Sequence, residues 1–140
     1  MIHPNPSLAS AVALLSSARL PVEDLTEAHC EHFFYSGPAH QPTGLVGLEM
    51  FGDVALLRSL VVSEALRGKG EGTALLEHAE RHARARGVRE LYLLTTTAEK
   101  FFEKHGFERA AREAAPGPIS GTREFAGICP ASSAFMVRRL

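Results

Sequence analysis

The chain has 140 residues, a formal net charge of −1, and 45% hydrophobic and 22% charged residues. This length predicts a single domain, residues 1–140, with a core of ordinary size. The near-neutral charge argues against nucleic-acid and membrane-surface partners, and no apolar run reaches the about 20 residues of a membrane span. The N-terminus lacks the pattern of an export signal and the two cysteines lie far apart, so we expect a cytoplasmic protein without a disulfide. The seven histidines are scattered in sequence, and we expect no metal.

Along the chain, segments whose apolar residues recur at helical spacing are followed by segments whose pattern is typical of strands. Apolar residues at helical spacing, prolines, glycines and short apolar runs set the expected bounds. In chain order we expect helices at 7–18 and 22–26, strands at 31–35, 44–51 and 54–62, a helix at 73–86, a strand at 90–95, a helix at 98–105, a strand at 107–110, a loop at 116–118, and a last strand at 133–137.

A glycine-rich turn, from Arg67 to Thr73, connects a predicted strand to a predicted helix. Glycines at the mouth of a helix let the backbone approach a ligand, and the free N–H groups and the helix dipole favour a phosphate. Lys69 is followed by Gly70 rather than Ser or Thr, which excludes a P-loop, and the alternating glycines do not fit GxGxxG. From glycine spacing alone, a plain strand-to-helix connection remains the alternative.

Two motifs resemble the GNAT family of acetyltransferases. Arg67-x-x-Gly70-x-Gly72 matches the family signature (Q/R)xxGx(G/A), and it follows a Leu60-x-Val62 strand end. The predicted helix at 98–105, which closes in Gly-Phe, looks like the family's later motif. The resemblance covers the chain from about residue 45 onward. It implies an α+β, three-layer GNAT fold, in which a mixed, mostly antiparallel sheet is splayed at its centre and has helices on both faces.

The same resemblance implies acetyl-CoA as cosubstrate. Backbone N–H groups at 67–73 would hold the pyrophosphate, and the strand end at 60–62 would pair with the pantetheine arm like an added strand. The arm would enter where the strands at 54–62 and 90–95 splay, so that the amide of Leu60 or Val62 polarises the thioester carbonyl. The residues expected to contact the cofactor are Leu60, Val61, Val62, Arg67, Gly68, Lys69, Gly70, Glu71, Gly72, Thr73 and Phe102.

The predicted chemistry lacks an obvious general acid. GNAT enzymes usually protonate the departing thiolate with a tyrosine of the later helix motif, but Phe102 stands there and cannot donate a proton. Tyr92, Tyr35, Cys129 and a bound water are the remaining candidates. Glu49 is a candidate base or amine anchor, with a solvated strand glutamate as the alternative.

Arg58 interrupts an apolar strand, and strict alternation places it on the face of Leu56, Leu60 and Val62. Arginine suits planar oxyanions, so we interpret it as a receptor for a substrate carboxylate, phosphinate or arsinate. An ion pair with Glu49 on the neighbouring strand is the alternative.

The threonines at the end of the strand at 90–95, Thr95, Thr96 and Thr97, offer hydroxyls to a substrate, with Thr95 as the candidate and Thr97 as the expected helix cap. Farther on, Thr122-Arg123-Glu124-Phe125 and Cys129-Pro130-Ala131-Ser132 resemble bacterial N-acetyltransferases associated with arsenic resistance, as do residues 53–59 and 93–98. Some of these acetylate the amine of arsinothricin or phosphinothricin. The resemblance implies that Arg58 and Arg123 hold the oxyanion or the α-carboxylate.

The sequence therefore predicts an N-acetyltransferase for a small, anionic, amino-acid-like amine. A protein or peptide acetyltransferase is the second interpretation. A non-catalytic acyl-CoA sensor is the third, and Phe102 is the feature that supports it. The last strand is a candidate edge for a homodimer, because edge strands often pair copies of such folds.

Overall fold

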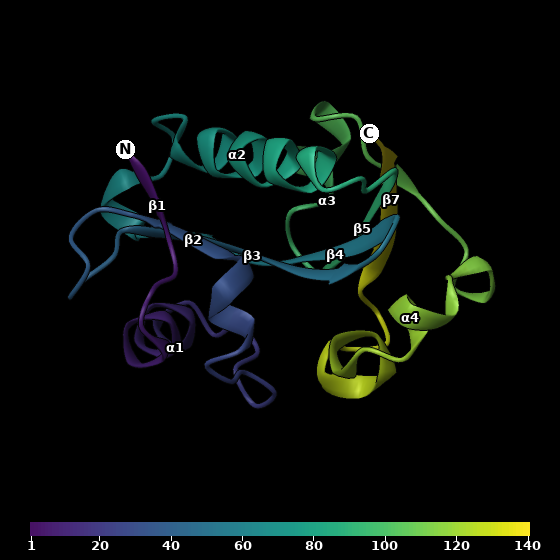
Figure 1. Cartoon of the computed structure of the whole chain (residues 1–140), viewed down its shortest axis with the longest axis horizontal. Helices are drawn as coiled ribbons and strands as arrows, with labels where there is room; N and C mark the ends of the chain where they lie inside the picture. Colours follow the sequence, from purple (N-terminus) through teal and green to yellow (C-terminus); the bar gives the residue numbers. More distant parts are fainter.

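Seven strands form one sheet with helices on both faces (Figure 1), and the computed structural model describes all 140 residues. The strand order is β1-β2-β3-β4-β5-β7-β6. Every neighbouring pair is antiparallel except β4 and β5, which are parallel. This confirms the predicted mixed, mostly antiparallel sheet. The strands are β1 (Ile2–Pro4), β2 (Phe33–Ser36), β3 (Gly44–Phe51), β4 (Val54–Val62), β5 (Glu90–Thr95), β6 (Glu108–Arg109) and β7 (Ala134–Arg139).

The helices divide between the two faces of the sheet. In Figure 1, α2 (Glu71–Ala85) and α3 (Glu99–Lys104) lie above it, whereas α1 (Leu8–Ser17) and α4 (Gly117–Ser120) lie below. Short 3₁₀ turns occur at His29–His32, Glu64–Leu66 and Arg112–Ala114, and a π-helical turn at Glu124–Ile128. None of the helices is both long and apolar enough to cross a bilayer.

The long helix α2 covers most of the upper face because its apolar stripe is continuous. Its buried residues recur at helical spacing and pack on the strands with α3, forming the largest hydrophobic cluster. The helix begins at Glu71, two residues before the expected start, because Gly70 takes a left-handed conformation with φ of 81° and ends the preceding turn.

Several predicted boundaries are wrong where tertiary pairing decides them. No helix forms at 22–26, where turns lead to the 3₁₀ turn at His29–His32. The strand expected at 31–35 consequently starts at Phe33, the first residue of β2 that pairs with β3, opposite Gly47. The expected loop at 116–118 contains the start of α4. The last strand runs to Arg139, because β5 pairs with it along its whole length. β1 is too short to show a period in the sequence.

β4 and β5 separate along their length, as predicted. Their pairing runs only from Val54–Glu90 to Leu56–Tyr92, and no partners follow. On its other side β4 contains a bulge, since Arg58 pairs with Gly47 but Val61 pairs with Leu45. The splay and the bulge therefore fall on the same stretch of β4.

The bulge overturns the alternation expected for β4. Ser59 has φ of 60°, and the extra residue shifts the side chains that follow it. Leu57, Leu60 and Val62 consequently pack with the cluster on the α2 face, whereas Arg58 lies on the opposite face with Leu56. Sequence alternation had placed Arg58 with Leu60 and Val62.

A close approach of backbone and ring requires a glycine at position 47. A Cβ there would lie 2.2 Å from Cε1 of Phe33, whose side chain is fully buried. We expect Gly47→Ala to lower the free energy of unfolding by about 1–3 kcal/mol in urea denaturation, because the ring has no room to move. Gly117→Ala is the control, since its Cβ would meet nothing within 4 Å. Equal losses in the two variants would contradict this packing.

Candidate active site

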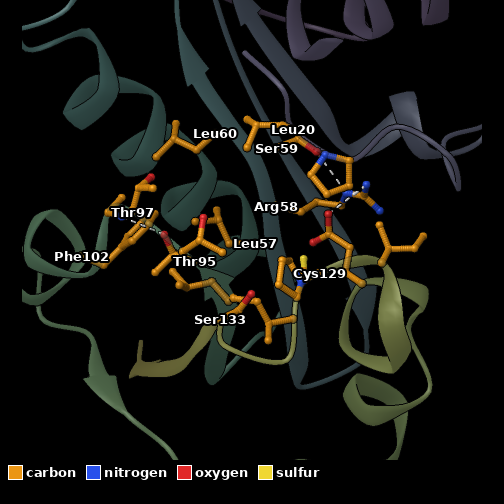
Figure 2. A pocket seen from close by; sticks show the side chains of 18 of the residues that line it. Leu20, Leu57, Arg58, Ser59, Leu60, Thr95, Thr97, Phe102, Cys129 and Ser133 are labelled. Carbon is orange, nitrogen blue, oxygen red and sulfur yellow. Dashed lines mark hydrogen bonds and ion pairs between the residues drawn. The ribbon is translucent and has the colours of Figure 1, made fainter. Parts of the chain in front are cut away.

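A cavity of about 410 Å³ opens where β4 and β5 separate (Figure 2). Figure 2 shows side chains of β4, β5 and the C-terminal segment, residues 121–133, around the same space, with Cys129 close to Arg58. Five parts of the chain contribute its walls: residues 57–60 of β4, residues 93–98 around the end of β5, α3, the turn at 19–23 after α1, and the C-terminal segment.

The edge of β4 is unpaired at this cavity. Ser59 and Leu60 have no partner on β3, because of the bulge, and none on β5, because pairing ends at Leu56. Leu60 lines the cavity, and Val62 lies beyond its lining. An extended ligand would therefore find an open strand edge at Leu60, where the sequence predicted the pantetheine arm.

The glycine-rich turn lies between the end of β4 and α2. Gly68 and Gly70 have φ of 80° and 81°, and a Cβ at either would meet nothing within 4 Å. Arg67 donates from Nε to the carbonyl oxygen of Val62 at 3.2 Å, which ties the turn to β4. Lys69 is exposed. The turn thus presents exposed backbone and positive charge at the N-terminus of a 15-residue helix.

The carboxylate of Glu71 is held away from this turn. It accepts hydrogen bonds from Ser36 Oγ and from Thr43 Oγ1, the latter at 3.3 Å. Thr73 contacts His105 of the α3 end through Oγ1 and Nε2, 3.2 Å apart. These contacts fix the first turn of α2 without using its backbone N–H groups, which helix geometry leaves unpaired.

Arg58 is the centre of a buried ionic cluster. Its side chain has no exposed surface, and its two terminal nitrogens form a fork on Asp24. Its Nη1 also donates to Glu49 at 2.9 Å, its Nη2 lies 3.1 Å from Glu124, and its Nε donates to Ser59 at 3.1 Å. Four hydrogen bonds and the ion pair with Glu124 engage all three nitrogens, so the guanidinium is already paired with protein acceptors rather than with a substrate oxyanion. The structure has the ion pair with Glu49 that the sequence offered as the alternative.

The pKa values of the groups in this cluster shift in different directions. Burial opposes the charge of Arg58, but its bonds to Asp24 and the nearby carboxylates outweigh burial and raise its pKa. For Asp24, burial is likewise outweighed by Arg58, and the pKa lies below its usual range. For Glu124, burial prevails over Arg58, the carboxylates of Asp24 and Glu49 add to it, and the pKa rises to about 7.

Glu49 and Arg123 lie outside the cavity at the splay. With Asp24 and His29 they line a second cavity of about 310 Å³ on the far side of Arg58. Asp24, His29 and Glu49 each offer one atom that could bind a metal ion, and these three atoms lie within 4.8 Å of one another. Arg58 already occupies both carboxylates, which favours an ion-pair network over a cation site.

Tyr92 also lies outside the cavity at the splay. Its ring stacks on Phe135 with centroids 5.4 Å apart, and its hydroxyl donates to Glu90 at 3.2 Å. Burial and Glu90 raise its pKa. Tyr92 therefore has a packing role in this structure, on the face of the sheet covered by α4.

Thr95, Phe102 and Cys129 do line the cavity. Thr95 Oγ1 accepts from the N–H of Ala98 at 3.0 Å, so Thr95 rather than Thr97 closes the turn before α3. Phe102 is almost fully buried against Phe107. Burial raises the pKa of Cys129 to about 12, with Glu124 adding to the effect, so the thiol stays protonated at neutral pH. Of the protein groups considered as general acid, Cys129 is the one in the cavity.

Sequence reasoning did not single out Asp24, Glu124 or Arg19 as site residues. Asp24 lies in a turn and Glu124 begins the π-helical turn, 34 and 66 residues from Arg58, and no spacing links them. Arg19 lines the cavity, is exposed and forms no ion pair. It has a φ of 59°, a strained conformation for a residue with a side chain. That strain is invisible in sequence.

Residues 28–109, more than half of the chain, match the acetyltransferase (GNAT) domain family. The chain belongs to the GNAT acetyltransferase family. The predicted GNAT fold is confirmed by the solved N-acetylglutamate synthase of Neisseria gonorrhoeae, in complex with coenzyme A and N-acetyl-glutamate. It superposes with a TM-score of 0.83 at 25% identity, over 100% of this chain and 35% of its own.

Two curated relatives match parts of this GNAT chain. An amino-acid acetyltransferase of Ralstonia nicotianae is 40% identical over 63 residues, 45% of this chain and 14% of the relative. An uncharacterized N-acetyltransferase of Chlorobaculum tepidum is 33% identical over 99 residues, 70% of this chain and 63% of the relative. The chain spans less than two thirds of each of these relatives and of the Neisseria synthase.

Removing the Arg58 guanidinium would leave three carboxylates facing one another. We expect Arg58→Met to lower the free energy of unfolding by about 3–5 kcal/mol in urea denaturation. The loss should be larger at pH 8 than at pH 5, because protonation relieves the carboxylates at the lower pH. Arg139→Met is the control, because Arg139 is exposed and its ion pair with Glu90, at 3.8 Å, is a long surface contact that contributes little stability. If the two variants lose equal stability, the cluster is not an organising interaction.

Proposed function

We propose that the chain is an acetyl-CoA-dependent N-acetyltransferase that acetylates the amine of a small amino-acid-like substrate. The observation that best supports this is the cavity at the splay of β4 and β5. It has an open strand edge at Leu60, and β4 leads from there to the phosphate-type turn at Arg67. The acyl end of acetyl-CoA would lie at the open edge of β4 near Leu60, and its phosphates would lie at the turn that follows the strand.

The proposed reaction is direct acyl transfer. The substrate amine attacks the thioester carbonyl carbon, and the backbone N–H of Leu60, at the unpaired edge of β4, polarises the carbonyl oxygen. A thiolate is a good leaving group, so a strong general acid is not essential. The Cys129 thiol lines the cavity, but with a pKa of about 12 it is too weak an acid to protonate the departing thiolate, which takes its proton from the attacking nitrogen instead.

Both similarity and cavity chemistry support an amino-acid-like substrate. One curated relative is named an amino-acid acetyltransferase, and the Neisseria synthase was solved with N-acetyl-glutamate. The cavity combines a buried carboxylate, Glu124, with an unpaired cation at its mouth, Arg19. An ammonium group suits the first and a carboxylate the second.

Within this class we propose acidic amino acids of the arsinothricin and phosphinothricin type, which the sequence motifs at 121–133 favour. The anion partner is then Arg19 rather than Arg58, because the donors of Arg58 are already used by the cluster. A peptide substrate is less favoured, since the turn at 19–23 and the C-terminal segment wall the cavity.

Turnover tests this substrate assignment. Coenzyme A release is followed with arsinothricin, phosphinothricin, glutamate, methionine sulfoximine and a lysine peptide as acceptors. We expect selective turnover of acidic amino acids, and a KM for them that rises at least about tenfold in Arg19→Gln, because a charge-assisted contact is lost. A larger effect in Arg123→Gln, the arginine favoured by sequence, would reverse the assignment. Preference for the lysine peptide would support the peptide interpretation, and binding without turnover would support a sensor.

The glycine-rich turn predicts how the cofactor binds. Gly70→Val forces a branched side chain onto a φ of 81°, and Gly52→Val does the same at a φ of 73° in the β3–β4 turn. We expect calorimetry to show coenzyme A affinity at least about tenfold weaker in Gly70→Val, because displaced backbone N–H groups cannot hold the phosphate. Gly52→Val should suffer comparable strain and retain affinity. Unchanged binding in Gly70→Val would remove the phosphate assignment.

A further inference from the structure

We propose that Glu124 is the catalytic base that takes the first proton from the substrate ammonium group, and that Arg58 positions it. The proposal rests on the proposed function and adds a residue to that site. Two carboxylates line the cavity, Glu23 and Glu124. Glu23 is exposed to solvent, whereas Glu124 is 4% exposed. Glu124 is therefore the acidic group that a bound amine would meet away from water.

The geometry leaves one oxygen of Glu124 available. Its Oε2 lies 3.1 Å from Nη2 of Arg58, and its Oε1 accepts no hydrogen bond from the protein. Because Oε1 is not a fully buried unpaired atom either, it keeps some solvent contact, and Glu124 is a lining residue of the cavity. Arg58 cannot turn away, because Asp24 and Glu49 hold its other donors.

The surrounding charges suit a base that works near neutral pH. Burial raises the pKa of Glu124 to about 7, with Asp24 and Glu49 adding to the effect and Arg58 opposing it. The groups that face it come from four parts of the chain: Arg58 from β4, Asp24 from the turn after α1, Glu49 from β3, and the Cys129 thiol from its own segment. A base with such a pKa is partly ionised at pH 7 and still basic enough to accept a proton.

The proton balance is as follows. The Glu124 carboxylate takes one proton from the ammonium group, which gives a neutral amine and a carboxylic acid. The nitrogen lone pair forms the C–N bond, and the C–S bond breaks with its electron pair on sulfur. The thiolate takes the second proton from nitrogen, which yields the amide and the free thiol of coenzyme A. Glu124 then returns its proton to solvent.

The location of Glu49 makes it a matched comparison. It contacts the same arginine, at 2.9 Å, from the second cavity and was the base favoured by sequence. Glu124→Gln and Glu49→Gln each remove one negative charge near Arg58 and keep the side-chain size. Only Glu124→Gln removes a carboxylate from the cavity at the splay.

We expect Glu124→Gln to lower kcat with the best acceptor by about 10²–10⁴-fold, with coenzyme A affinity retained. The wild-type pH profile of kcat/KM should rise through an apparent pKa near 7, and that limb should vanish in the variant. Hydroxylamine, which is neutral at pH 7 and needs no deprotonation before attack, should be acetylated with a much smaller loss. Glu49→Gln should keep the limb, displaced to lower pH because the Glu49 charge helps to raise the pKa of Glu124, and should lose less than about threefold in kcat.

Stability gives a second measurement that does not depend on turnover. The folded-state pKa of Glu124 exceeds its ordinary value of about 4.3, so protonation stabilises the fold. This contribution is complete below about pH 4 and is lost as the pH rises through about 7. Wild-type stability relative to Glu124→Gln should therefore fall across this window, as measured by urea unfolding.

The outcomes separate the two proposals. If the wild type acetylates acidic amino acids but Glu124→Gln keeps its rate and its pH limb, the role of Glu124 is wrong and the proposed function stands. If Glu49→Gln loses the limb instead, Glu49 is the base. If the wild type acetylates no amine at all, the proposed function itself fails, and the role of Glu124 fails with it.

Discussion

The buried guanidinium of Arg58 is the interaction on which the lower face of the molecule depends. A charge with no exposed surface costs several kcal/mol unless it is paired, and three carboxylates from separate segments supply the pairing. Asp24 brings in the turn after α1, Glu49 belongs to the neighbouring strand, and Glu124 brings in the C-terminal segment. The two smaller hydrophobic clusters, under α1 and under α4, are thereby joined through one ionic centre. The walls of the cavity are the segments that this centre holds.

The second constraint is the bulge that begins after Arg58. One extra residue at Ser59 releases β4 from its register with β3 at the place where β5 has already diverged. The strand consequently presents Arg58 to one face, presents Leu60 to the other, and leaves a backbone edge unpaired. A regular strand would have kept Ser59 and Leu60 paired with β3 and would have placed Arg58 and Leu60 on one face. In the proposed function this edge receives the acyl arm of the cofactor.

The site is electrostatically divided, in a way that suits the proposed reaction. Arg67, Lys69 and the N-terminus of α2 form a positive end, where a polyanionic cofactor would bind. The floor near Arg58 has three carboxylates against one guanidinium, and it suits a cationic amine. Glu71 could have disturbed the positive end, but its carboxylate is bonded to Ser36 and Thr43 instead. The cofactor phosphates would therefore be attracted to the turn beyond the end of β4, and the acceptor amine to the region of Arg58 at its middle.

Local pattern in the sequence determined β3, β4 and β5 to the residue, the long helix α2, the glycine-rich turn and the family, because periodicity, glycine spacing and short motifs are properties of neighbouring residues. The sequence also offered the Arg58–Glu49 pair, since adjacent antiparallel strands bring such residues together. Only the tertiary structure decided that Asp24 and Glu124 complete that cluster, and that Glu49 and Arg123 face a second cavity. These placements depend on segments 34 and 66 residues from Arg58 and on a bulge that reverses side-chain direction within β4. Charge partners and strand irregularities are set by packing between distant segments, and no local pattern encodes them.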